Sequence, residues 1–160
     1  MPQLRTGDRA PDIELPDQMG RTVRLSDFAG RKVLLYFYPM AGTPACTQQA
    51  CRIRDARDEL VGLGVAPIGV SPDRPERLKR FDTTRGLKFA LLSDPDFTAA
   101  RAYGVLRGLR VLGLGLRWVR RSAFLIDERG EVLRAWYGVR AGDTVRNVTE
   151  ALGGQDAAGR

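Results

Sequence analysis

Apolar residues along this chain follow two spacings, and the change from one to the other predicts an α/β fold. Continuous apolar runs at 33–38 (VLLYFY) and 65–70 (VAPIGV) are typical of strands buried on both faces of a sheet. Between them, residues 45–63 repeat apolar positions at helical spacing, and glycines end the segment. A strand, a helix and a second strand in this order predict a crossover connection between parallel strands.

Weaker patterns on either side complete the predicted domain. Before the first buried run, short segments around a turn at 16–20 predict an N-terminal β-hairpin. The later predicted elements are helices near 75–85, 97–103 and 143–152 and strands at 89–92, 122–127 and 132–137. We therefore expect one domain over residues 1–152, a central sheet flanked by helices, and a disordered tail at 153–160.

Length and composition agree with one domain of this kind. The chain has 160 residues with 43% hydrophobic content, which suffices for one core. Residues 1–16 carry charged side chains and no long apolar run, unlike a signal peptide. No segment approaches the roughly 20 apolar residues that span a bilayer. We therefore expect a cytoplasmic location.

The ionisable residues narrow the chemistry. The chain contains no histidine and two cysteines. A Ser-His or Cys-His hydrolase and most histidine-ligated metal sites are thereby excluded. Paired cysteines in a cytoplasmic chain are more often redox-active than structural, so the two thiols become the candidates.

Both cysteines lie in residues 38–51 (YPMAGTPACTQQAC), where a buried strand ends and a helix begins. With Thr43 as N-cap and Pro44 at the first helical position, Cys46 falls in the first helical turn. Free backbone N–H groups and the helix dipole stabilise an anion there, and the thiolate is the reactive form of cysteine. Cys46 is therefore the candidate nucleophile, and a small buried hydrophobe is the alternative.

The spacing P-x-x-x-T-x-x-C, formed by Pro39, Thr43 and Cys46, resembles the peroxiredoxins. The stretches FYPMAGTPACTQQACRIRD, IGVSPD, LLSDPD and RSAFLID are similar to the Q type of that family, the bacterioferritin-comigratory group. The resemblance covers residues 7–152. It implies a thioredoxin-like fold with a mixed sheet, a peroxidase without metal or organic cofactor, and a monomer or weak dimer.

The resemblance also implies roles for individual residues. Cys46 matches the peroxidatic cysteine and Cys51 the resolving cysteine. The active-site threonine, proline and arginine are matched by Thr43, Pro39 and Arg121. Gln49 stands where many members carry glutamate, so its amide still accepts a hydrogen bond from Arg121 but adds no charge.

The implied cycle begins with attack of the Cys46 thiolate on hydrogen peroxide or an organic hydroperoxide. The resulting sulfenic acid condenses with Cys51 to a disulfide, which a thioredoxin-like dithiol reduces. Residues five apart on an ideal helix have Cα atoms about 8.7 Å apart. A disulfide tolerates at most about 7 Å. We therefore predict that the helix partly unwinds in each turnover and is regular when reduced.

Residues 104–119 (GVLRGLRVLGLGLRWV) depart from the polar loop expected of the Q type. They lie in a stretch between Asp96 and Asp127 that contains arginines and no acid, in a chain of formal net charge +7. The arginines of that stretch are Arg101, Arg107, Arg110, Arg117, Arg120 and Arg121. One interpretation is a basic, apolar patch that contacts an anionic membrane or admits a lipid hydroperoxide. The other is a loop packed on the core or in a subunit contact.

Two functions other than a peroxidase fit parts of this sequence. A thiol-disulfide oxidoreductase fits the strand-helix pattern, but the chain lacks a C-x-x-C pair. A module that holds nucleic acid through the basic segment needs exposed aromatics among basic residues. Most aromatics here fall in predicted strands, so we expect no nucleic-acid partner.

Overall fold

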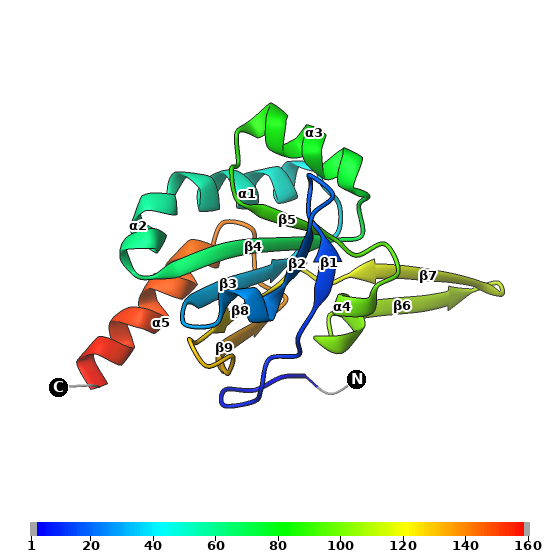
Figure 1. Cartoon of the computed structure of the whole chain (residues 1–160). Helices are drawn as coiled ribbons and strands as arrows, with labels where there is room; N and C mark the ends of the chain where they lie inside the picture. The colour runs from blue at the N-terminus through cyan, green and yellow to red at the C-terminus, as the bar shows by residue number, and fades with distance from the viewer. Residues whose placement is uncertain (1–2, 159–160) are drawn as a thin grey trace.

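The computed structural model describes residues 3–158, and a five-stranded sheet forms its centre (Figure 1). The strands, in spatial order, are β5 (Ala90–Ser93), β4 (Val65–Ser71), β3 (Lys32–Phe37), β8 (Ser122–Ile126) and β9 (Val132–Tyr137). The pairs β3–β4 and β4–β5 are parallel, and β3–β8 and β8–β9 are antiparallel. The sheet is therefore mixed, as the family resemblance implied.

The central strand β3 explains why the sequence at 33–38 is apolar without a break. Leu34 and Tyr36 point into the core on one face of the sheet, and Leu35 and Phe37 into the core on the other. All four side chains are fully buried. A strand covered on both faces has no polar side, because successive side chains point in opposite directions.

Helices cover the two faces unequally (Figure 1). The helices are α1 (Pro44–Asp55), α2 (Arg57–Gly62), α3 (Pro75–Arg85), α4 (Thr98–Ala102) and α5 (Thr144–Ala158), with a 3-10 turn η1 (Leu25–Phe28). Buried residues of α1, α2, α3 and α5 pack together on the face of Tyr36. The opposite face is covered by α4, η1 and the N-terminal segment. Within residues 3–158, no helix is both long and apolar enough to cross a membrane.

Two helices differ from the prediction. The segment expected as one helix over 45–63 is broken at Ala56, which has φ −90° and ψ 6°. No proline or glycine marks this break, so periodicity alone does not find it. Helix α5 continues to Ala158, whereas we expected disorder from residue 153. Glycines weaken a helix but keep their N–H donors, and the alanines that follow favour it; residues 159–160 lie outside the described residues.

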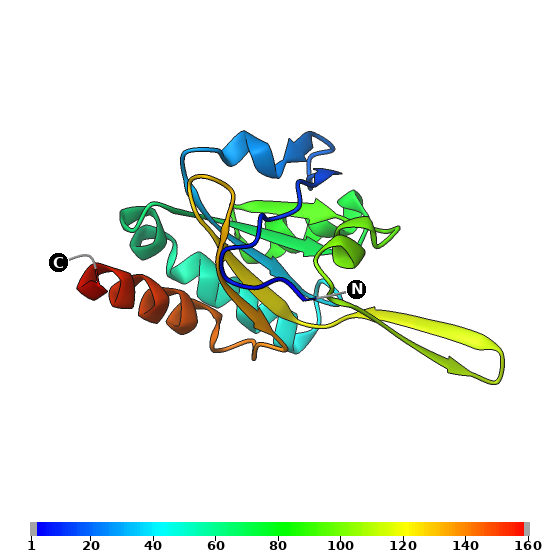
Figure 2. The same ribbon diagram turned by 90° about the horizontal axis from the view of Figure 1, so that it is seen from below.

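Two hairpins flank the sheet. The predicted N-terminal hairpin is formed by β1 (Glu14–Pro16) and β2 (Thr22–Arg24), which pair antiparallel. The second hairpin was not predicted: β6 (Leu106–Val111) and β7 (Leu114–Val119) pair along their whole length. They extend together away from the rest of the chain (Figure 2). Only the base of the segment 104–119 packs on the core, through Val105 and Val119, and the rest is a projecting hairpin and not a packed loop.

Candidate active site

Strand β3 and helix α1 place Cys46. The strand ends at Phe37, and helix α1 begins at Pro44 after a short loop, with Thr43 at the N-cap position. Cys46 is therefore the third residue of the helix, and it is buried beneath the first turn with 1% of its surface exposed. The first-turn N–H groups lack helical acceptors, so this position suits a thiolate.

A chain of hydrogen bonds holds an arginine against the sulfur of Cys46. Arg121 Nη2 donates to Cys46 Sγ at 3.2 Å, and Arg121 Nη1 donates to Gln49 Oε1 at 2.6 Å. The amide of Gln49 in turn donates to Thr144 Oγ1 at 2.9 Å. Gln49 and Thr144 are both buried. The guanidinium is therefore fixed from behind, and its charge faces the sulfur.

This arginine comes from a distant part of the sequence. Arg121 directly precedes β8, whose first residue, Ser122, pairs with Phe37 at the end of β3. The antiparallel pairing of β3 and β8 thus carries Arg121 to the start of α1. Arg120, its neighbour, lies against Gly138 instead of the sulfur. The structure therefore separates two arginines that are adjacent in the sequence.

Thr144 is a site residue that sequence analysis missed. It is the first residue of α5 and fills the end of the hydrogen-bond chain behind Gln49. Its only sequence signal is a hydroxyl at the start of a predicted helix, which usually indicates a cap. Thr144 reaches Gln49, which in turn binds Arg121, only because α1 and α5 pack against each other.

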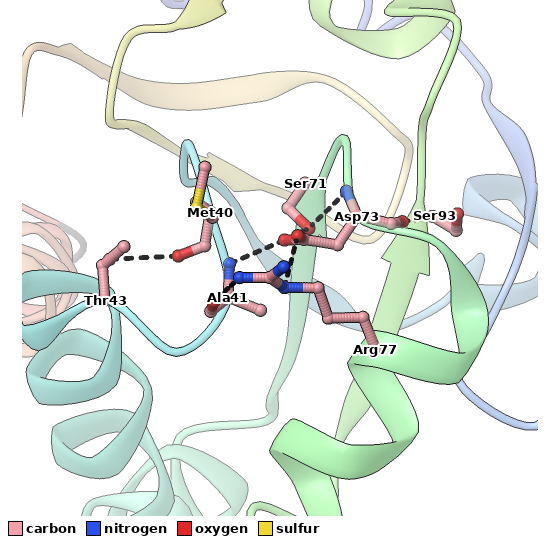
Figure 3. A network of polar contacts seen from close by, with 7 residues as sticks. All are labelled: Met40, Ala41, Thr43, Ser71, Asp73, Arg77 and Ser93. Carbon is pink, nitrogen blue, oxygen red and sulfur yellow. Dashed lines mark hydrogen bonds and ion pairs between the residues drawn. The ribbon is translucent and has the colours of Figure 1, made fainter.

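The hydroxyl of Thr43 has a different partner from the one expected of an N-cap. Its Oγ1 donates to the carbonyl oxygen of Met40 at 3.0 Å, and its side chain makes no capping bond to the helix. Pro39 is half-buried at the start of the same loop. Thr43 and Pro39 therefore both belong to the turn that leads from β3 into α1, and Figure 3 shows the contact of Thr43 with Met40.

Asp73 anchors the other side of this turn (Figure 3). Its Oδ2 accepts hydrogen bonds from the N–H of Ala41 at 2.6 Å and from Ser71 Oγ at 2.8 Å. Its Oδ1 lies 3.2 Å from Arg77 Nε, and Arg77 Nη2 donates to the carbonyl of Ala41 at 3.2 Å. Both backbone groups of Ala41 are thus held by side chains, one from the loop between β4 and α3 and one from α3. Although Ser71 and Asp73 precede α3 and are of the residue types that cap helices, the N-cap of α3 is Arg74.

Apart from Arg121, the side chains that pack with Cys46 in the core are uncharged. Tyr36, Tyr38, Ala50 and Cys46 belong to one buried cluster. Burial raises the pKa of Tyr36 well above its usual value, so its phenol stays neutral. Within the described part of the chain, no three potential metal-ligating side chains come together. The chemistry of the site therefore rests on a thiol, an arginine and backbone N–H groups.

Cys51 lies five residues after Cys46 on α1, which is about 1.4 helical turns. It is half-buried and packs against the core on that face of the sheet. Both cysteines are free, and the helix between them is unbroken. On a regular helix, residues five apart point in directions about 140° apart. The two sulfurs therefore do not face each other in this conformation.

A mixed sheet flanked by helices, with a buried cysteine in the first turn of a helix and an arginine beside its sulfur, is the arrangement of a thioredoxin-like thiol enzyme. Residues 6–135 match the AhpC/TSA family. The match covers most of the chain, so this protein belongs to the AhpC/TSA family and is a peroxiredoxin, an enzyme with peroxidase activity.

Individual relatives agree with this assignment. Peroxiredoxin Bcp of Escherichia coli is 46% identical over 132 residues, which cover 82% of this chain and 85% of the relative. Among solved structures, peroxidoxin BcpB of Mycobacterium tuberculosis has a TM-score of 0.86 at 36% identity, covering 94% of this chain and 97% of that one. The bacterioferritin comigratory protein of Xanthomonas campestris has a TM-score of 0.83 at 29% identity, covering 89% and 91%. The predicted resemblance and fold are confirmed.

Proposed function

We propose that this chain reduces hydrogen peroxide and organic hydroperoxides with Cys46 as the attacking residue. The observation that supports the proposal is the 3.2 Å contact between Arg121 Nη2 and Cys46 Sγ at the start of α1. The related Xanthomonas campestris protein is described as having alkyl peroxide reduction activity, which favours organic hydroperoxides among the substrates.

The first step of the proposed reaction is a displacement at oxygen. The Cys46 thiolate attacks the terminal oxygen of the hydroperoxide, a sulfur–oxygen bond forms, and the oxygen–oxygen bond breaks. The departing oxygen takes a proton and leaves as water or an alcohol, and Cys46 becomes a sulfenic acid. Negative charge moves from sulfur to the departing oxygen, so donors of Arg121 beside the sulfur stabilise the transition state.

The second step uses Cys51. Its thiol attacks the Cys46 sulfenic acid, a disulfide forms, and water is released. A thioredoxin-like dithiol then reduces the disulfide by thiol–disulfide exchange and returns both cysteines to thiols. Because the two sulfurs point in different directions on α1, the disulfide requires part of the helix to unwind.

The experiment that tests this cycle follows oxidation of the protein by one equivalent of hydrogen peroxide. We expect the wild type to lose two hydrogens by mass spectrometry and to lose helical circular dichroism, because α1 opens to join the cysteines. Cys51→Ser is the matched control: it should consume about one equivalent of peroxide, stop at the sulfenic acid, and keep its helical signal. A disulfide formed with no loss of helical signal would contradict the unwinding step. Failure of Cys51→Ser to consume peroxide would contradict the assigned roles.

Asp73 provides a test of the loop that precedes α1. In Asp73→Ala the N–H of Ala41 loses its acceptor and Arg77 loses its ion pair, so the first turn of α1 is no longer held in place. We expect the rate of Cys46 oxidation in stopped-flow measurements to fall by about tenfold to hundredfold, since small displacements of reacting groups have effects of this size.

The control for this variant is Asp58→Ala, which removes an exposed carboxylate from α2. It should react at the wild-type rate. Equal rates for Asp73→Ala and the wild type would show that the loop does not depend on this carboxylate.

A further inference from the structure

The β6–β7 hairpin presents large apolar side chains to solvent. The most exposed are Leu112 at 98%, Leu114 at 73% and Leu116 at 59%. The hairpin stands away from the sheet on both of its faces (Figure 2). A two-stranded hairpin is only marginally stable in water by itself, and an uncovered apolar surface of this kind usually marks an interaction site.

The register of the two strands sorts their side chains onto two chemically different faces. Partners in an antiparallel pair lie on the same face, and faces alternate along each strand. The pairs Leu109–Leu116 and Val111–Leu114 share one face with the pair Arg107–Trp118. The pairs Gly108–Arg117 and Arg110–Gly115 occupy the other face. The outer part of the ribbon is thus amphipathic, with an apolar stripe of leucines and Val111 on one face and Arg110 and Arg117 on the other, while Arg107 on the first face and the pair Leu106–Val119 on the second lie at its base.

The tip of the hairpin adds a second unusual feature. Leu112 and Gly113 both have positive φ angles, 53° and 79°, as in the tight turns that usually carry asparagine and glycine. A leucine adopts this conformation rarely. Its side chain is nonetheless the most exposed large apolar group among those of the described residues. The apolar stripe therefore ends in a projecting leucine at the point furthest from the sheet.

Charge and size indicate what covers this face. The stretch between Asp96 and Asp127 has six arginines and no acid, so a second copy would bring like charges together. Stable protein interfaces use about 20–30 residues from each side, whereas the two strands of this hairpin have 12 residues together, of which only half lie on the apolar face. Nucleic acid would pair with the arginines but leave the leucines in water. An anionic bilayer satisfies both faces, because it offers phosphates beside an apolar interior.

We infer that the β6–β7 hairpin docks on an anionic lipid bilayer. Leu112 and the apolar stripe enter the interface, and the guanidinium groups of Arg110 and Arg117 bind lipid phosphates. The hairpin leads directly into Arg121, which contacts Cys46, so docking brings the active-site end of the sheet towards the bilayer. Docking itself does not depend on the proposed peroxide chemistry.

The test is sedimentation of the whole protein with vesicles of phosphatidylglycerol or of phosphatidylcholine at low ionic strength. We expect the wild type to pellet with the anionic vesicles and to stay in solution with the neutral ones. Arg110→Gln/Arg117→Gln should bind anionic vesicles about 25-fold more weakly, at roughly fivefold for each arginine near the surface. The control Arg57→Gln/Arg80→Gln removes two exposed arginines elsewhere. Its binding to anionic vesicles should weaken by less than half as much as that of the hairpin variant.

The apolar stripe is tested by Leu112→Ser/Leu114→Ser/Leu116→Ser, which should no longer pellet, while Val61→Ser on α2 should bind like the wild type. Thermal unfolding establishes that each variant is folded. Trp118 is a second readout, since its emission should shift to shorter wavelength on anionic vesicles and Trp118→Phe should lack the shift.

Three results would overturn docking. The wild type could stay in solution with anionic vesicles. The leucine variant could bind as well as the wild type. Sedimentation velocity could reveal a dimer that the leucine substitutions dissociate, with no vesicle binding, which would assign the apolar face to a second copy of the chain.

Discussion

We expect the Cys46→Ser variant to consume no hydroperoxide in the presence of a thioredoxin reducing system. This is the largest effect that we expect of any single substitution. The turnover rate should fall by at least about 10⁴-fold, because a serine hydroxyl is far less ionised and less nucleophilic than a thiol at neutral pH. We expect the rest of the site to stay in place in this variant, because the substitution replaces only the buried sulfur atom of Cys46 with oxygen. The measurement is NADPH oxidation coupled through thioredoxin reductase, with hydrogen peroxide and with an alkyl hydroperoxide.

Cys51→Ser is the control for that experiment, because it makes the same chemical change five residues later on the same helix. It should lose steady-state turnover with thioredoxin but keep a single rapid reaction with peroxide. The pair of variants thus separates attack on peroxide from recycling. Sustained turnover by Cys46→Ser would show that the attacking residue lies elsewhere.

Arg121→Ala should show the second-largest effect. It removes the guanidinium donor that lies 3.2 Å from Cys46 Sγ. It also leaves Gln49 Oε1 without the hydrogen bond that Arg121 donates. Loss of one donor that stabilises charge in a transition state lowers rates by about 10²–10³-fold. We expect this decrease in the second-order rate constant for oxidation of Cys46, measured in single turnover so that the reductant does not contribute.

Arg120→Ala is the matched control, because it deletes the same charge from the adjacent position. Its guanidinium lies against Gly138, away from the sulfur. The variant should therefore oxidise at nearly the wild-type rate. Similar losses in both variants would mean that total positive charge, and not the contact with Cys46, sets the rate. Arg121→Lys should restore little of the lost rate, because a lysine ammonium does not reproduce the guanidinium geometry that binds Cys46 and Gln49 together.

Some contacts of the site could not be predicted because they join residues far apart in the sequence. Asp73 shows this clearly: its sequence position before a helix predicts a cap, yet its carboxylate binds Ala41, 32 residues away. Thr144 reaches Gln49 across 95 residues in the same way. Local patterns carry no information about which polar group will lie opposite another after folding. Both residues were therefore assigned only from the folded chain.

The sequence at 104–119 is apolar and basic, but it does not show that this segment forms a hairpin. Frequent glycines interrupt its alternation, so the pattern fits a loop as well as two strands. The pairing of β6 with β7 determines which residues share a face. Only that register separates the leucines from Arg110 and Arg117, and the docking inference depends on the separation.

The sequence by itself determined the elements that local rules govern. Unbroken apolar runs identified β3 and β4, and Thr43 with Pro44 located the start of α1 and hence Cys46 in its first turn. These features follow from burial and from backbone hydrogen bonding over a few residues. The tertiary structure alone decided how Arg121 reaches that sulfur, because this contact between residues 75 apart in the sequence depends on the pairing of β8 with β3. Long-range pairing is fixed by the packing of the whole sheet, which no local pattern records.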